Sequence, residues 1–317
     1  MRTPEVGAEP GARGGTKTSR TGPFTVITRL DAPSSRLLAP VAVPENRYIA
    51  RSSDGDRTMF VSTPLVGADP RPFMVEAEAS RFLLGPWALP ATELAPPGDA
   101  PWHARPYVPA LPLPTALAVH GGPLPERTVR ALGAALAETL AIAHNQRLTH
   151  AGLSPAAVLL AADGPRLTCF GAVRAAAPDG TARSGLPGLD AGSLPPEQAS
   201  GGRPRPMGDV YALGATLAYA ATGTTAPERD ELPPALRSVI GRCLARDPGD
   251  RPQLAAVQEE FVPPSPSPVA TQTGSRAAAL LGPGWLPARV IAAIAHQSAA
   301  LLAAEPDLLA PADRPQD

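Results

Sequence analysis

Lysine is almost absent from this sequence. Of its 28 basic residues only Lys17 is a lysine, and it lies in the run GARGGTKTSRTG near the N-terminus. The compact ammonium group of lysine is not replaced conservatively by the planar guanidinium group of arginine. Schiff-base catalysis, a P-loop and any other lysine grip on a phosphate are therefore excluded for the folded part of the chain.

Three other features are also scarce. The 28 basic residues face 29 acidic ones, so there is no basic excess to bind nucleic acid. The two cysteines, Cys169 and Cys243, form neither a disulfide framework nor a zinc-site spacing. No run of about 18 apolar residues and no charged-then-apolar leader is present. We expect a soluble, cytoplasmic protein without a membrane span.

The composition predicts a folded domain with irregular flanks. Hydrophobic residues make up 44% of the chain, which suffices for a core, but 42 Pro and 29 Gly among 317 residues point to structureless segments as well. We expect a disordered tail at 1–22, a folded domain at 23–261 and a Pro/Ser-rich linker at 262–284. A C-terminal helix and tail would fill 285–317. Its helix, at about 287–304, is too polar for a bilayer and should dock on the domain or on a partner.

The first part of the domain has short strand patterns and one helix. Strands are predicted at 24–30, 47–52 and 58–65, and Asp54–Asp56 has the residue types of a hairpin turn. A one-sided apolar pattern predicts a helix at about 72–84.

The second part is mainly helical. Pro125 and Glu126 suit the start of a helix, and apolar residues then recur at helical spacing for about five turns. A hairpin is predicted from two short apolar runs, and a loop fills 172–196. Further helices are predicted at 209–223, 233–247 and 252–261.

Five segments of the chain resemble, in order and spacing, the motifs of the protein-kinase fold. They are THAGLSPAAVLL for the catalytic loop, RLTCFG for the strand into Asp-Phe-Gly, LPPEQ for Ala-Pro-Glu, DVYALGATLAYAATG for the buried helix and CLARDPGDRP for the closing arginine motif. The resemblance covers about 24–261 and is closest to bacterial eukaryotic-like Ser/Thr kinases. It implies an α+β bilobal fold with a small N-terminal β-rich lobe (23–105) and a larger α-helical lobe (110–261).

The resemblance also places the chemical positions of a kinase on residues that lack the chemistry. Ser62 stands for the phosphate-gripping lysine, Ala151, Gly152 and Ser154 for the arginine, aspartate and lysine of the catalytic loop, Ala157 for the metal-binding asparagine and Cys169 for the metal-binding aspartate. The expected glycine-rich loop, between Leu30 and Tyr48, contains no glycine. Glycine cannot act as a base, and neither alanine nor cysteine offers the hard oxygen that magnesium prefers.

Architectural positions of the family are retained. By resemblance, Glu197 and Arg251 form a buried ion pair, Asp209 binds the backbone of the catalytic loop, and Glu76 is the helix glutamate that has lost its lysine. Without the lysine, we expect Glu76 to be an acid on the helix face, with pairing to an arginine such as Arg51 as the alternative. His150, Phe170 and Gly171 are the other structural residues.

The favoured hypothesis is a pseudokinase that folds, transfers no phosphate, needs no cofactor and acts as a regulatory or scaffolding module through unidentified protein partners. The first alternative is a divergent Ser/Thr kinase with residual ATP binding and weak activity. Adenine binding without metal, at the hinge-like segment 101–110, is a second. An unrelated helical binding protein would require the motif order to be accidental.

Overall fold

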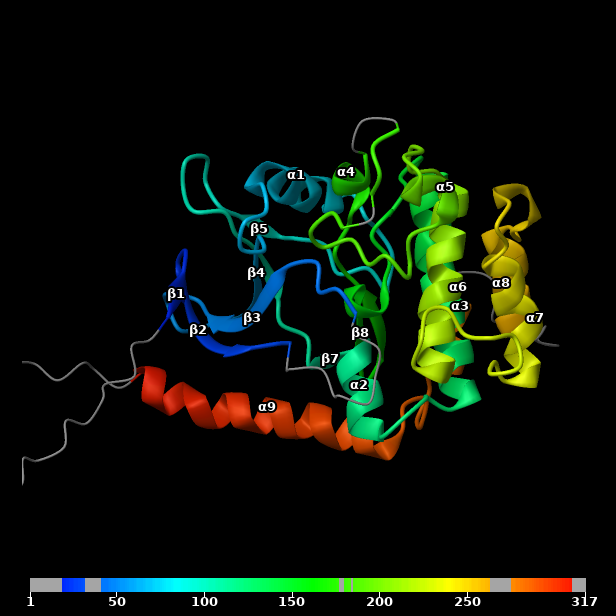
Figure 1. The fold of residues 1–317 in the computed structure, drawn as a ribbon. Coiled ribbons are helices and arrows are strands. Elements are labelled where there is room, and N and C mark those ends of the chain that lie inside the picture. Colours follow the sequence, from blue (N-terminus) through cyan, green and yellow to red (C-terminus); the bar gives the residue numbers. More distant parts are fainter. Residues whose placement is uncertain (1–18, 32–40, 177–179, 184, 263–274, 310–317) are drawn as a thin grey trace, which may run out of the picture.

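The chain folds into a small lobe built on an antiparallel sheet and a larger helical lobe (Figure 1). The computed structural model describes residues 19–31, 41–176, 180–183, 185–262 and 275–309, the side chains of the last range up to residue 304. The α+β bilobal, kinase-like fold expected from the motifs is confirmed. Lys17 and most of the segment expected as a glycine-rich loop (32–40) lie outside the described residues.

The small lobe is an antiparallel sheet with the strand order β1-β2-β3-β4-β6-β5. Met59 and Val61 point to one face, where they pack with Phe24 and Trp102. Phe60 points to the other face, toward the large lobe, because successive side chains of a strand alternate. The strands are β1 (Arg20–Thr21), β2 (Phe24–Arg29), β3 (Asn46–Arg51), β4 (Thr58–Thr63), β5 (Glu93–Leu94) and β6 (His103–Pro106).

The helix of the small lobe, α1, spans Pro70–Ser80. Asp69 caps it by accepting a hydrogen bond from the backbone N–H of Arg71, and a proline occupies its first position. The helix therefore begins and ends earlier than the predicted 72–84, and the side chain of Phe82 beyond its end is 64% exposed.

The large lobe surrounds the long helix α3 (Glu126–Asn145), whose apolar face is buried against α6 (Pro206–Thr222) and α8 (Leu254–Phe261). A second sheet, β7-β8-β9, lies where the lobes meet. Its strands are β7 (Ala110–Pro112), β8 (Val158–Ala161) and β9 (Gly164–Leu167). Further helices of the lobe are η1 (Pro155–Ala157), α4 (Ala172–Ala175), α5 (Pro196–Ala199), α7 (Pro234–Cys243) and η2 (Pro248–Asp250).

One helix of the large lobe was not expected from the sequence. The segment Leu113–His120 forms α2 and ends at Gly121, which adopts a φ of 91°. The sequence does carry end signals for this helix, because proline fits a helix start and glycine fits a left-handed C-terminal cap. The Pro-rich segment before the helix obscured them.

Two expected boundaries shift in the structure. Residues 20 and 21 pair with β2, so the folded chain begins inside the predicted 1–22 tail, of which 1–18 lie outside the described residues. The predicted 262–284 linker is shortened from its far end, because the segment from Ser275, with the turn η4 (Ala277–Leu280), packs on α3. Residues 263–274 of this segment lie outside the described residues.

The C-terminal helix α9 spans Ala288–Leu309 and docks on the domain, along α2 and β7. Val290, Ile294 and Leu301 are buried in this contact. Within the described part of the chain, no helix combines the length and apolarity needed to cross a bilayer.

Candidate functional site

The segment that matches the catalytic loop is held by Asp209 of α6. Its carboxylate accepts hydrogen bonds from the backbone N–H of His150 (2.8 Å) and of Ala151 (2.7 Å), and it lies 2.8 Å from His144 Nε2. Ala151 adopts a left-handed φ of 52°, which a residue other than glycine keeps only where its surroundings impose it. The backbone of the loop is therefore fixed by its contacts with Asp209.

His150 is a buried packing residue of this loop. Its Nδ1 accepts a hydrogen bond from Gly152 N–H at 3.2 Å, and its ring meets the edge of the Phe170 ring at 5.6 Å between centroids. Burial lowers the pKa of His150 to about 4, which outweighs the opposing effect of Asp209. The imidazole is thus neutral near pH 7 and lies inside the protein.

Gly152, at the position of the catalytic aspartate, is packed backbone to backbone. A Cβ atom placed on it would overlap the carbonyl oxygen of Cys169 and lie 2.6 Å from Gly171 N and 2.8 Å from Gly171 Cα. Gly171 N–H donates to the carbonyl oxygen of His150 at 3.0 Å. This hydrogen bond holds segment 150–152 against segment 169–171. The site lacks both the carboxylate and the space for any side chain that could carry one.

Cys169, at the position of the metal-binding aspartate, is buried and points into the cleft between the lobes. Burial and the nearby Glu45 raise the pKa of its thiol to about 12, so it stays protonated at neutral pH. The other matched position, Ala157, offers only a methyl group. Among the described residues there is no group of three or more His, Cys, Asp or Glu side chains that could hold a metal.

An arginine of the small lobe lies beside both of these positions. Arg47 Nη1 donates to the carbonyl oxygen of Ala156 at 2.6 Å and is 4.0 Å from Cys169 Sγ, while Arg47 Nη2 pairs with Asp31 at 2.5 Å. Burial alone would lower the pKa of the Arg47 guanidinium, but the contacts with Asp31 outweigh burial and raise the pKa above its ordinary value. The guanidinium therefore stays charged. The guanidinium beside Cys169 is paired with Asp31 and presents only N–H donors, so it adds no oxygen ligand for a divalent cation. The residues present therefore do not fit magnesium.

Ser62, at the position of the phosphate-gripping lysine, belongs to a buried polar cluster. Its hydroxyl donates to Glu45 Oε1 at 2.7 Å, and Glu45 also contacts His103 Nε2 at 3.1 Å and Arg105 Nη2 at 3.9 Å. Burial works against ionisation of Glu45, yet its contacts with His103, Arg105 and Ser62 lower its pKa below the ordinary value. The carboxylate is a fixed anion where a nucleotide would bring its own negative charge.

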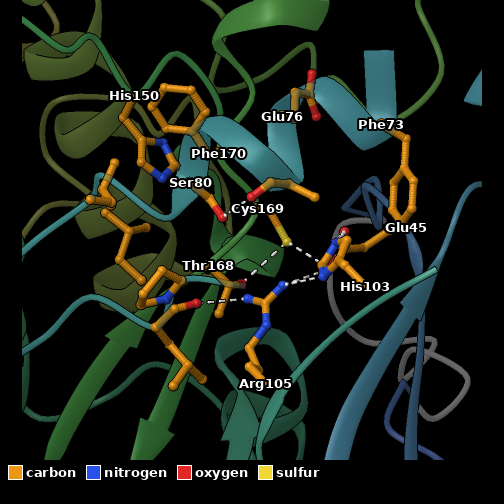
Figure 2. A pocket seen from close by; sticks show the side chains of 15 residues that line it. Glu45, Phe73, Glu76, Ser80, His103, Arg105, His150, Thr168, Cys169 and Phe170 are labelled. Carbon is orange, nitrogen blue, oxygen red and sulfur yellow. Dashed lines mark hydrogen bonds and ion pairs between the residues drawn. The ribbon is translucent and has the colours of Figure 1, made fainter. Parts of the chain in front are cut away.

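The space left between these groups is small. Figure 2 shows the cavity beside them, where Arg105 is hydrogen-bonded to His103, and Thr168 to Cys169. Its volume is about 20 Å³, which is enough for roughly one water molecule. Ligand pockets of proteins usually measure about 300–1,000 Å³. The side chains of the cleft thus occupy this part of it themselves.

Glu76 of α1 pairs with Arg174 of α4, and not with Arg51. Its carboxylate accepts from the backbone N–H of Arg174 at 2.8 Å and from the Arg174 guanidinium. Burial raises the pKa of Glu76 to about 7 against the lowering effect of Arg174. The pair ties α1 to the segment that follows Cys169-Phe170-Gly171.

Glu197 and Arg251 form a two-pronged ion pair at the far side of the large lobe. The two guanidinium nitrogens of Arg251 donate to the two carboxylate oxygens of Glu197 at 2.7 and 2.8 Å. The Arg251 side chain is fully buried, whereas that of Glu197 is 28% exposed. Arg251 also donates to the carbonyl oxygen of Met207, so it joins α5, α6 and the chain after η2.

Of the residues singled out from the motifs, Ser62 and Cys169 both contact Glu45, and Gly152 packs against Cys169. Ala157 accepts a hydrogen bond from Thr168, and Ala151, Gly152 and Ser154 line a separate hollow of the large lobe. Sequence reasoning missed Glu45, Arg47, Arg105 and Arg174. The sequence carried a partial signal for the first two, because charged residues directly before and within a strand of alternating pattern need a buried partner.

The fold and the cleft define a kinase-like protein, and the comparisons agree. The chain is 30% identical over 297 residues to the serine/threonine-protein kinase AfsK of Streptomyces coelicolor, a match that covers 87% of this chain and 35% of that protein. It is 32% identical over 257 residues to the probable serine/threonine-protein kinase PkwA of Thermomonospora curvata, covering 74% of this chain and 33% of that one.

A third relative is the serine/threonine-protein kinase PknK of Mycobacterium tuberculosis, 35% identical over 189 residues, which are 52% of this chain and 17% of that protein. The chain spans about a third of the length of AfsK and PkwA. No protein-family model matches it.

Proposed function

We propose that this chain is a pseudokinase: a kinase-like domain that transfers no phosphate and acts, as a regulatory or scaffolding module in the cytoplasm, through contacts with other proteins. The observation that carries the proposal is the backbone contact of Gly152 with Cys169 and Gly171. A general base at this position typically contributes about 10²–10⁴ in rate, and here no side chain of any kind can be placed without moving the loop.

The charges of the cleft support the same proposal. Phosphoryl transfer depends on metal ions and a cationic side chain that hold the phosphates. The place of the lysine is taken by Ser62, which is bonded to the anion Glu45. The Arg47 guanidinium stands beside the places of the metal ligands, and it is already neutralised by Asp31 and engaged by a carbonyl oxygen.

The surface around α1 supports the role in protein contacts. Six large apolar side chains are exposed among the described residues. Four of them lie on α1 or within four residues of its ends, namely Val66, Val75, Phe82 and Leu84, with exposed fractions from 52% to 100%. Exposed apolar side chains that gather in one region mark interaction sites more often than scattered ones do.

The alternative is a divergent Ser/Thr kinase, which the similarity to AfsK, PkwA and PknK favours. The two functions are separated by a thermal-shift titration of the full chain with ATP, with and without magnesium or manganese, beside a radiolabel-transfer assay. We expect no metal-dependent shift and no transfer. A metal-dependent rise of several degrees, or label transfer that is abolished by substituting a cleft residue, would contradict the pseudokinase proposal and establish the alternative.

A further inference from the structure

The C-terminal helix α9 contacts both lobes. Figure 1 shows it along one side of the molecule, from α2 of the large lobe to the level of β1 and β2 of the small lobe. Val290 and Ile294 are buried in the core of the large lobe, whereas Leu301 belongs to a different cluster. The three positions share one helix face, because steps of 4 and 11 residues are whole turns to within about 40°.

The cluster that contains Leu301, called here the interlobe cluster, lies between the lobes. Phe60 and Ile49 reach it from the cleft-facing side of the small-lobe sheet, and Leu159 reaches it from β8 of the large lobe. Every member is 5% exposed or less. The members are Leu30, Ile49, Phe60, Ala110, Leu159, Ala161 and Leu301.

The same cluster abuts the segment between the lobes. Tyr107 and Val108, which connect β6 to β7, pack against it, and Tyr107 Oη donates a weak hydrogen bond to Gln297 Oε1 of α9 at 3.4 Å. The resemblance to kinases places adenine against the backbone of this hinge. Leu301 thus fills an apolar cluster that adjoins the segment where the resemblance would place adenine.

We propose that the hinge side of the cleft is a binding site for an amphipathic helix, and that α9 occupies it in this chain and excludes adenine from it. A ligand tethered to its own site acts at an effective concentration in the mM range. The tether here is short and partly fixed, because Trp285 Nε1 donates to the carbonyl oxygen of Ala162 at 2.8 Å directly before the helix begins. A free nucleoside would have to compete with this high effective concentration of α9.

The test compares two neighbouring leucines of α9 in the full chain. Leu301→Asp puts a charge into the interlobe cluster, whereas Leu302→Asp changes a side chain that is 65% exposed. The ligand added is adenosine without metal, so the measurement does not depend on phosphoryl transfer. The result therefore tests the position of α9 even if the pseudokinase proposal proves wrong. Hydrogen exchange of the α9 amides reports whether the helix has detached.

We expect adenosine at mM concentration to raise the Tm of Leu301→Asp by 2 °C or more and to leave the wild type and Leu302→Asp unchanged. A peptide of residues 285–304 added to Leu301→Asp should suppress this shift. The proposal is overturned if the wild type responds to adenosine as the variant does, or if α9 detaches and adenosine still has no effect. If hydrogen exchange shows that α9 is still docked in Leu301→Asp, the double variant Ile294→Asp/Leu301→Asp is used in its place. The same two outcomes then overturn the proposal.

Discussion

At the residue scale, the chemistry of the cleft is decided by contacts of the main chain. Gly152 and Gly171 touch through their backbones, and Ala151 and Cys169 on either side hold left-handed φ angles of 52° and 59°. A left-handed conformation costs an L-residue roughly 1–2 kcal/mol. The loop and the segment that follows β9 therefore keep a strained backbone although neither Ala151 nor Cys169 is a glycine.

The first prediction concerns Gly152. Gly152→Ala should lower the free energy of unfolding by about 3 kcal/mol, the upper end of the usual cost of overpacking, because the new methyl group meets backbone atoms that cannot rotate away. Gly152→Asp should be at least as destabilising and should not restore phosphoryl transfer. Urea unfolding and a label-transfer assay measure the two effects.

Gly241 of α7 supplies the control, since a Cβ atom there would meet nothing within 4 Å. Gly241→Ala should stabilise the protein by about 1 kcal/mol, as alanine does inside a helix. If Gly152→Ala behaved like Gly241→Ala, the close approach of the loop to Gly171 would be refuted.

A second residue-scale prediction concerns pH. The pKa of His150 is about 4 in the folded protein and about 6.5 in an unfolded chain. Folding therefore favours the neutral ring, and this contribution is complete above pH 6.5 and is lost as the pH falls toward 4. The urea midpoint of the wild type should fall over this window, and that of His150→Gln, which does not titrate, should fall less. Equal slopes for the two proteins would show that His150 is not the buried neutral group described.

At the element scale, ion pairs link segments that are distant in the sequence. Arg251 joins α5 and α6 through its bonds to Glu197 and Met207, whereas Arg242 and Glu260 form a pair between α7 and α8 in which the side chains are 47% and 37% exposed. Buried and exposed pairs differ in their effect, because removing one partner of a buried pair leaves an uncompensated charge.

The third prediction follows from this difference. Arg251→Ala should reduce the free energy of unfolding by about 3 kcal/mol, the lower end of the range for buried pairs since Glu197 is partly exposed. Arg242→Ala should change it by no more than about 1 kcal/mol. Thermal or urea unfolding of both variants provides the measurement, and losses of the same size in the two would argue against Arg251 as an anchor of α5.

Elements were predictable where the local pattern and the packing agree. The hairpin β3–β4 follows its turn residues, and α3 follows five turns of apolar spacing. The helix α2 was missed because a Pro-rich context hid its caps. The partner of Glu76 could not be inferred, since Arg174 lies 98 residues away and reaches α1 only through the fold. The interlobe position of Leu301 likewise depends on where α9 docks, which helical periodicity does not encode.

At the scale of the whole molecule, the two lobes are joined by side chains that cross the cleft. Arg47 of β3 binds Asp31 within the small lobe and the carbonyl oxygen of Ala156 in the large lobe. Leu301 of α9 adds an apolar contact to the strands of both lobes. A domain joined in this way should open as one unit, because neither lobe can separate without exposing a buried charge and an apolar cluster.

The last prediction tests this coupling. Arg47→Ala leaves Asp31, whose side chain is only 11% exposed, without its partner and removes the bond to Ala156. A loss of about 3–5 kcal/mol is typical when one partner of a buried pair is removed. It should fall mainly on the small lobe, because Asp31 belongs to it and α3 keeps its own core. Hydrogen exchange of the β3 and β4 amides should therefore accelerate about 100-fold or more, while the α3 amides keep their protection.

Arg57→Ala is the control, since Arg57 pairs with Glu93 on the surface, where 53% and 33% of the two side chains are exposed. This variant should leave the exchange of the β3, β4 and α3 amides unchanged. Equal acceleration of β3, β4 and α3 would mean that the lobes stay one cooperative unit without Arg47, and no acceleration would mean that the guanidinium does not hold them together.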